Sequence, residues 1–316
     1  MIPLIIKLQS STIHTDFKKD FFMKKLIVLL LFSMGLFAME PIVSAEWLNK
    51  NLTDKNLRIV HVSEADDYLL EHIVNAQNSS IGKWRESKGS YLLVRSSQEI
   101  QDEIQRLGID QKSRVVLYAN ISSPMDLLKT TYIYWALNYH GIKNVAILNG
   151  GMSSWKESGY ELSDQVAGVK KSDYKVKIDS KLVADKAYVM QNLHKLPMID
   201  ARPADKYLGI TPTDTVERDG HISGAMSYSW NYSVDNSYML KDVKKLEMLF
   251  RDGYKLDKES EVLVYCTGGL ETSFNYFVLS GVLGYKHVRL YDASMKEWGN
   301  YSDTPMVKYT YEVFKR

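Results

Sequence analysis

The chain has 316 residues, of which 45% are hydrophobic and 25% charged, so it is too long for one small core and suits two domains of ordinary size. Its formal charge is +2, from 40 basic and 38 acidic residues. The first 38 residues hold five Lys and two Asp, which leaves 35 basic and 36 acidic residues in the rest of the chain. A near-neutral chain argues against binding to nucleic acid.

The N-terminus predicts an export signal. Met23 is followed by two lysines and by an apolar run over residues 26–37 that ends at Ala38, the pattern of a secretory signal peptide. The run is short for a membrane span, although a membrane-anchored N-terminus is the alternative. We expect residues 1–38 to be a signal peptide with an over-extended start and translation to begin at Met23. The mature protein would then lie in a bacterial periplasm, without a stable membrane span.

The second half of the chain repeats the pattern of the first. Each half has a buried strand leading to a His-Ile turn, an apolar strand followed by a loop and a helix, and a strand ending in a turn before another helix. These landmarks lie at 58–76, 115–139 and 145–155, and again at 198–225, 262–282 and 288–298. Strands that alternate with helices predict two tandem doubly wound α/β domains, each with a parallel sheet flanked by helices and with ligands beyond the carboxyl ends of the strands.

Composition also predicts the domain boundaries. The segment 161–180 is polar and lacks an apolar period, so it is interpreted as a linker. The expected domains are therefore residues 43–160 and residues 181–305, followed by a C-terminal tail over residues 306–316.

Cys266 is the only cysteine, so no intramolecular disulfide can form. It directly follows the strand 262–265 and precedes Gly268 and Gly269, beyond which a helix begins. The glycines allow a tight turn, and the helix start supplies unpaired N–H groups that favour an anionic sulfur, so we expect a lowered thiol pKa. Such a thiolate can take up sulfur as a persulfide and pass it on without a metal or organic cofactor. The alternative is a small buried apolar residue.

The residues around Cys266 resemble the active loop of the rhodanese family of sulfurtransferases, in which Cys, a Gly three residues later and a closing Thr or Ser recur. Further similarity lies at 43–48, 200–202, 220–222 and 291–298, and the resemblance covers about residues 43–305. It implies a catalytic second domain, a non-catalytic first domain and a pocket between them. The implied active loop consists of Cys266, Thr267, Gly268, Gly269, Leu270, Glu271 and Thr272.

The resemblance also implies that Arg202, beside Asp200, faces an anionic donor, the alternative being a structural ion pair. Thr267 and Gly268 stand where thiosulfate-using members carry Arg and Lys, which favours mercaptopyruvate, whereas the stretch 206–209 is similar to thiosulfate-type sequences. We expect thiosulfate or polysulfide as donor and a thiol or cyanide as acceptor, with a redox or sulfur-accepting protein as a further candidate partner. A 3-mercaptopyruvate sulfurtransferase or a non-catalytic sulfur carrier is the alternative.

The loop departs from the family pattern at Glu271, where Thr, Ser or Arg is usual. A carboxylate that pointed inward would oppose both a thiolate and an anionic donor, and one that pointed outward could cap the helix. Ala293 and Met295 replace a usual Gly and Trp. A Cys-dependent phosphatase is disfavoured because no arginine closes the loop, and the scattered histidines predict no metal site.

Overall fold

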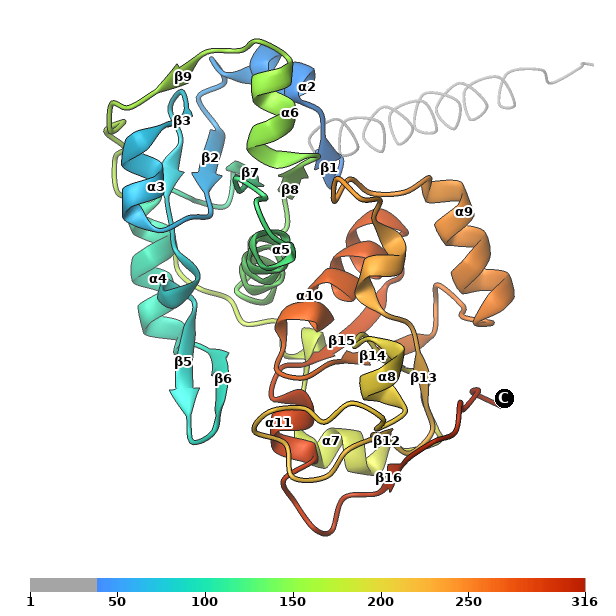
Figure 1. Cartoon of the computed structure of the whole chain (residues 1–316). Helices are drawn as coiled ribbons and strands as arrows, with labels where there is room; N and C mark the ends of the chain where they lie inside the picture. Colours follow the sequence, from blue (N-terminus) through green and yellow to red (C-terminus); the bar gives the residue numbers. More distant parts are fainter. Residues whose placement is uncertain (1–38, 316) are drawn as a thin grey trace, which may run out of the picture. The chain divides into compact units, whose positions relative to one another are not determined.

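The computed structural model describes residues 39–315, so the expected signal peptide and start lie outside the described residues. Two five-stranded parallel sheets form the frame, in the orders β1-β8-β7-β2-β4 and β10-β15-β14-β11-β13 (Figure 1). The two orders are the same topology used twice. The predicted tandem α/β architecture, with parallel sheets flanked by helices, is therefore confirmed.

The first half of the described chain, residues 39–179, contains one sheet and its helices. Its elements are β1 (Ile42–Val43), α2 (Ala45–Asn51), β2 (Leu57–His61), α3 (Ala65–Leu70), β3 (His72–Ile73), β4 (Gln77–Asn78), η1 (Ile81–Lys83), β5 (Arg85–Lys88), β6 (Tyr91–Val94), α4 (Ser97–Arg106), β7 (Arg114–Tyr118), α5 (Pro124–Tyr139), β8 (Val145–Leu148), α6 (Gly151–Glu157) and β9 (Leu162–Ser163).

The second half, residues 180–315, repeats this arrangement. Its elements are η2 (Ser180–Leu182), β10 (Val183–Ala184), α7 (Lys186–Gln191), β11 (Met198–Asp200), α8 (Ala204–Tyr207), β12 (His221–Ile222), β13 (Ala225–Ser227), η3 (Trp230–Ser233), α9 (Val243–Met248), η4 (Leu249–Gly253), β14 (Glu261–Tyr265), α10 (Leu270–Tyr276), η5 (Phe277–Val282), β15 (His287–Tyr291), α11 (Ser294–Trp298) and β16 (Met306–Val307).

The turn from β14 into α10 follows from the local sequence. β14 is an apolar run in the centre of its sheet, and four of its five residues are buried, as expected for a strand covered on both faces. Gly269 precedes the helix with a φ of 93°, a left-handed conformation that strains residues with a β-carbon. Strand, turn and helix thus place the loop after β14 at the carboxyl edge of the sheet.

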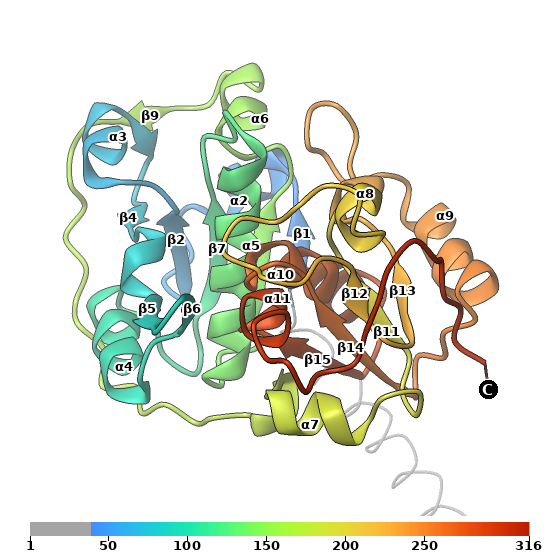
Figure 2. The ribbon, with the colours of Figure 1, turned by 60° about the horizontal axis from the view of Figure 1, so that its bottom comes forward.

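The two halves pack through α5 and α10, which lie side by side (Figures 1 and 2). α5 is buried on nearly all sides, as a helix enclosed by protein should be. The Thr131 and Ser273 hydroxyl oxygens are 3.0 Å apart, and the Tyr134 and Phe277 rings form a T-shaped pair with their centroids 4.9 Å apart. The halves therefore share a core.

Two peripheral segments tie the chain together. The β5–β6 hairpin of the first half reaches the second, where Tyr91 donates to a Glu297 carboxylate oxygen at 3.0 Å. In the tail, β16 pairs antiparallel with β12, and Glu312 accepts from the Gly224 N–H at 2.6 Å.

Residues 164–179 carry no helix or strand, but the linker and domain boundaries stay predictions.

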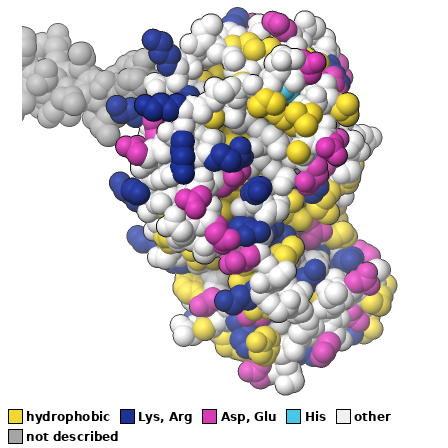
Figure 3. Space-filling model, turned by 90° about the vertical axis from the view of Figure 1, so that its left-hand side faces the viewer, with side chains coloured by type: hydrophobic (Ala, Val, Ile, Leu, Met, Phe, Trp, Pro, Cys, Tyr) yellow, Lys and Arg dark blue, Asp and Glu magenta, His cyan; other side chains and the backbone are white. Residues whose placement is uncertain are grey.

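The surface in Figure 3 shows basic and acidic side chains interspersed. Within residues 39–315, no helix has both the length and the apolar character needed to cross a membrane. The same part of the chain contains no group of three or more His, Cys, Asp or Glu residues placed to hold a metal ion.

Candidate active site

Cys266 lies directly after β14 and is fully buried. Its Sγ accepts hydrogen bonds from the N–H groups of Gly268 at 3.3 Å and Gly269 at 3.2 Å. Both donors are backbone groups of the loop that the sequence identifies, here called the cysteine loop (residues 266–272). The loop therefore encloses the sulfur with N–H groups, the arrangement that stabilises a thiolate or a persulfide anion.

The start of α11 anchors the cysteine loop from a second side. Ser294 Oγ accepts from the Cys266 N–H at 3.0 Å, and the carbonyl oxygens of Cys266 and Thr267 accept from the N–H groups of Met295 and Lys296 at 3.1 and 2.9 Å. The Lys296 side chain also covers the loop, because its Cδ would lie 3.3 Å from a β-carbon placed on Gly268. The sequence shows Lys296 only as one charge on a short helix, so its position beside the loop was not predicted.

The pKa of the Cys266 thiol is higher than expected. Burial raises it to about 12, and the Glu271 carboxyl adds to the rise. The Thr272 side chain and the N–H groups of Thr272 and Gly268 lower the pKa, and the N–H contribution is the one that the sequence predicts, but together they do not outweigh burial. The expectation of a lowered thiol pKa is therefore wrong, because the fully buried sulfur loses the solvation that an anion needs.

Glu271 points toward the sulfur. Burial raises the pKa of its carboxyl, and a hydrogen bond with Cys266 lowers it. The carboxyl also interacts with the charges of Asp200 and Arg202, although the residue is only partly buried. Of the two orientations left open by the sequence, the structure shows the inward one, which places a proton acceptor beside the thiol.

Arg202 and Asp200 form a buried ion pair at the end of β11. The Nε of Arg202 lies 2.9 and 3.1 Å from the two carboxylate oxygens of Asp200, and Nη2 lies 2.5 Å from one of them. Nη2 also donates to the Gly220 carbonyl at 2.7 Å, and the residue is 1% exposed. This is the geometry of the structural ion pair considered above, and a role of Arg202 in donor binding stays a prediction.

The first half contributes Arg85 to the cysteine loop. Arg85 Nη2 donates to the Gly268 carbonyl at 2.6 Å and lies 3.7 Å from a carboxylate oxygen of Asp292. Tyr132, also from the first half, donates to Asp292 at 2.7 Å. Sequence reasoning missed this contact, since 183 positions separate Arg85 from Gly268 and no local pattern marks the arginine.

The loop of the first half, residues 119–123, stands at the place that the cysteine loop occupies in the second. Ala119 follows β7 where Cys266 follows β14. The N–H groups of Ser122 and Ser123 donate to one Asp126 carboxylate oxygen at 3.1 and 2.9 Å. A carboxylate of the chain itself thus occupies the donors of this loop, and a non-catalytic first domain stays a prediction.

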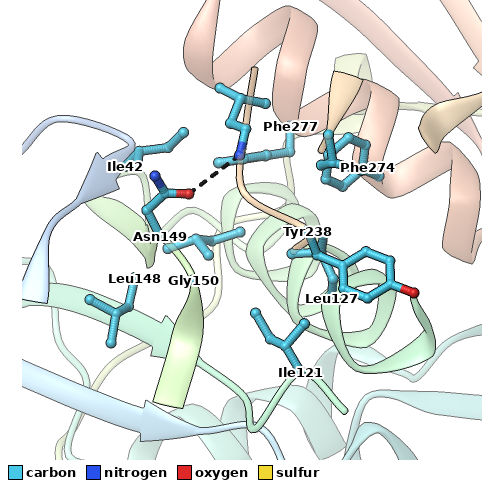
Figure 4. Close-up of a pocket in the computed structure, with 12 residues that line it drawn as sticks. Ile42, Ile121, Leu127, Leu148, Asn149, Gly150, Tyr238, Phe274 and Phe277 are labelled. Carbon is cyan, nitrogen blue, oxygen red and sulfur yellow. Dashed lines mark hydrogen bonds between the residues drawn. The ribbon is translucent and has the colours of Figure 1, made fainter. Parts of the chain in front are cut away.

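An apolar pocket lies where the halves meet (Figure 4). It is lined by Ile42 and Ile121 of the first half and by Tyr238 and Phe274 of the second, among others. No charged side chain and no residue of the cysteine loop lines it. It is therefore not suited to an anionic sulfur donor.

The comparisons with known proteins agree with this geometry. The family model for the rhodanese-like domain matches residues 44–158 and 183–301. The sulfur carrier protein TtuD of Thermus thermophilus is 30% identical over 292 residues, which cover 87% of this chain and 99% of that protein. A putative thiosulfate sulfurtransferase of Haloferax volcanii is 30% identical over 290 residues, covering 86% of this chain and 98% of that protein.

Solved structures show the same fold. The crystal structure of YnjE matches with a TM-score of 0.75 and 19% identity, over 86% of this chain and 69% of that one. A structure of EanB with ergothioneine also gives a TM-score of 0.75, with 18% identity over 85% and 70% of the two chains. With two matched domains and a sulfur held by loop N–H groups, the chain belongs to the rhodanese-like family.

Proposed function

We propose that the protein is a sulfurtransferase that moves a sulfane sulfur from thiosulfate or polysulfide to a thiol or cyanide through a persulfide on Cys266. The observation that carries the proposal is the pair of N–H groups, of Gly268 and Gly269, directed at Sγ from 3.3 and 3.2 Å. Relatives named as thiosulfate sulfurtransferases support this class of reaction.

In the first step the thiol loses its proton and Sγ attacks the outer sulfur of thiosulfate. The S–S bond of the donor breaks, and sulfite leaves with the bonding electron pair. The persulfide formed on Cys266 carries one negative charge, which the loop N–H groups stabilise. A cyanide or thiolate acceptor then attacks the outer sulfur, leaves as thiocyanate or as a new persulfide, and releases the Cys266 thiolate.

Removal of the proton from the Cys266 thiol is the step of this reaction that burial makes unfavourable. With a pKa of about 12, the thiol stays protonated near neutral pH, and the thiolate is the reactive form. The Glu271 carboxyl and the Cys266 thiol each shift the pKa of the other, so we assign Glu271 as the group that accepts the proton when a donor arrives. Because Cys266 is fully buried, the donor also requires neighbouring side chains to move before it can reach Sγ.

The proposal is tested by the intact mass of the protein after exposure to thiosulfate, polysulfide or 3-mercaptopyruvate. A gain of one sulfur that cyanide removes, and that Cys266→Ala lacks, supports transfer through Cys266 and identifies the donor. A gain with 3-mercaptopyruvate alone would show that 3-mercaptopyruvate, and not thiosulfate or polysulfide, is the donor. The small residues Thr267 and Gly268 favour that outcome. No gain with any donor would contradict the proposed reaction.

A sulfur-carrier role is the second candidate. The raised pKa and full burial of Cys266 favour slow exchange, and one relative is named a sulfur carrier protein. The two roles differ in turnover. A carrier becomes persulfidated once but produces thiocyanate no faster than the uncatalysed reaction, whereas an enzyme releases many equivalents.

We also propose that the protein is exported to a bacterial periplasm. The support is the apolar run over residues 26–37 behind two lysines. Cell fractionation combined with N-terminal mass determination tests the proposal, and an unprocessed chain found only in the cytoplasm would contradict it.

A further inference from the structure

One peptide group of the cysteine loop has both of its polar ends occupied. The peptide between Gly268 and Gly269 donates its N–H to Cys266 Sγ at 3.2 Å, and its carbonyl accepts from Arg85 Nη2 at 2.6 Å. The peptide is trans, so its C=O and N–H point in opposite directions. Whatever fixes the carbonyl therefore also fixes the direction of the N–H toward the sulfur.

Arg85 is itself held on several sides. Its Nη2 also donates to the Leu92 carbonyl at 2.9 Å, and its guanidinium lies 4.6 Å from the centre of the Tyr132 ring. The Asp292 carboxylate is 3.7 Å away, and Arg85 is 8% exposed. A planar guanidinium fixed in this way has little freedom, so it can hold a backbone carbonyl in one orientation.

Asp292 of the second half contacts Arg85 and two further residues of the first half. Its carboxylate accepts from Tyr132 at 2.7 Å and from the Val94 N–H at 2.8 Å, both in the first half. The loop backbone lies directly on the pair, because a β-carbon at Gly269 would be 2.1 Å from Asp292 Oδ1 and 3.2 Å from Arg85 Nη2. The loop thus rests on a charged contact between the halves.

We propose that Arg85, although it belongs to the half without a cysteine, is a positioning residue for sulfur transfer because it holds the Gly268–Gly269 peptide with its N–H directed at Cys266. A cation on the carbonyl side also polarises the peptide, which strengthens the N–H as a donor to an anionic sulfur. This inference rests on the proposed function and assigns the first half a direct part in it.

The test must separate positioning from stability, because removing Arg85 alone leaves Asp292 buried without its cation. The double variant Arg85→Met/Asp292→Asn removes both charges and keeps an amide oxygen for Tyr132 and Val94. Its matched control is Arg114→Met/Asp54→Asn. That control pair is an ion pair too, and its guanidinium also lies near an aromatic ring, 5.3 Å from that of Trp47. Both of its members belong to the first half, and Arg114 lies at the opposite, amino end of its sheet.

Two measurements follow: the rate of Cys266 alkylation by iodoacetamide from pH 7 to 10, and kcat and KM for thiosulfate with cyanide. For Arg85→Met/Asp292→Asn we expect alkylation to be about 10-fold slower and kcat to be lower on the order of 100-fold. This is the effect expected when one oriented hydrogen-bond donor to a developing anion is lost. KM should stay within about twofold of wild type, because a residue that acts through the Gly268 carbonyl is expected to affect the transition state more than the binding of the donor. The Arg114 control should match wild type in both measurements.

A folded double variant with wild-type alkylation and kcat would overturn the proposal. If circular dichroism shows that it does not fold, Arg85→Lys decides, because it keeps a cation beside Asp292 but loses the planar fork. An intermediate loss of kcat supports positioning, and wild-type values refute it. Alkylation needs no sulfur donor, so it still tests Arg85 if the wild-type protein forms no persulfide and the proposed function fails.

Discussion

The two halves of the molecule have the same strand order in their sheets, but the loops after their central strands hold different groups. In each, a tyrosine at the end of the central strand accepts from an isoleucine N–H, Tyr118 from Ile73 at 2.9 Å and Tyr265 from Ile222 at 3.1 Å. The histidine of each His-Ile turn stacks on a tyrosine, at 3.9 Å in the first half and 3.7 Å in the second. Both histidines are thus accounted for by packing.

The difference lies in the group that the loop donors hold. Loop N–H groups hold the Asp126 carboxylate in the first half and the Cys266 sulfur in the second. An oriented set of N–H groups binds an anion of either kind. The two halves therefore share a turn whose N–H groups hold a carboxylate in the first half and the thiol sulfur in the second.

The largest effect is expected where the second loop has no room for a side chain. Gly269→Ala places a β-carbon 2.1 Å from Asp292 Oδ1 at a φ of 93°, so we expect a loss of about 2–4 kcal/mol in the free energy of unfolding. Sulfur transfer should fall at least ~100-fold, because the donor N–H moves. Urea unfolding and thiocyanate production measure these effects.

Gly159→Ala is the matched control in the first half. Its φ is 68°, and nothing lies within 4 Å of the added β-carbon, so only backbone strain is expected, about 1 kcal/mol. Sulfur transfer should be unchanged. Equal losses of activity in the two variants would show that general destabilisation, and not the loop, limits the reaction.

The frame and the position of the sulfur were predictable because both depend on local pattern. The run 262–265 is apolar and is followed by two glycines, which is sufficient to predict a strand, a tight turn and a helix. The thiol pKa was not predictable, since it depends on the full burial of Cys266 in the folded chain and on the Glu271 carboxyl beside it. Arg85 was missed for the same reason, as tertiary packing alone brings it to Gly268.

The next effect sharpens the contrast between the two groups that the loops hold, the Asp126 carboxylate and the Cys266 thiol. Replacing Glu271 by Gln removes a negative charge that helps to raise the pKa of Cys266, so the thiol should lose its proton at lower pH. We expect iodoacetamide to alkylate Cys266 on the order of 10-fold faster at pH 8, since one adjacent charge shifts a pKa by about one unit or more. In wild type the rate should still rise at pH 10 without a plateau, because the pKa of about 12 is not yet reached.

Alkylation and turnover should respond to this variant in opposite directions. If Glu271 accepts the proton during transfer, Glu271→Gln lowers kcat while alkylation becomes faster. A variant in which both become faster would show that the carboxyl only opposes the thiolate. Unchanged alkylation would contradict the inward orientation of Glu271.

A smaller effect is expected at Lys296, whose side chain covers Gly268. A lysine beside the cysteine loop is expected to attract an anionic sulfur donor by its positive charge. Lys296→Gln should therefore raise KM for thiosulfate about 3-fold to 10-fold. Higher salt should reduce the difference between variant and wild type. Lys195→Gln, at an exposed lysine of the same half, is the control, and an equal change in both would indicate only an effect of net charge.

The smallest effect tests the first half on its own. Asp126 Oδ2 accepts from the N–H and hydroxyl groups of both Ser122 and Ser123, so Asp126→Ala removes the carboxylate half of the capping box at the start of α5. We expect a loss of about 1–2 kcal/mol in the free energy of unfolding and no change in persulfide formation at Cys266. Asp126→Asn keeps one acceptor oxygen, so its loss in the free energy of unfolding should be smaller. Because α5 packs against α10, a fall in sulfur transfer that exceeds the change in stability would mean that the first loop, although occupied by its own carboxylate, still influences the second.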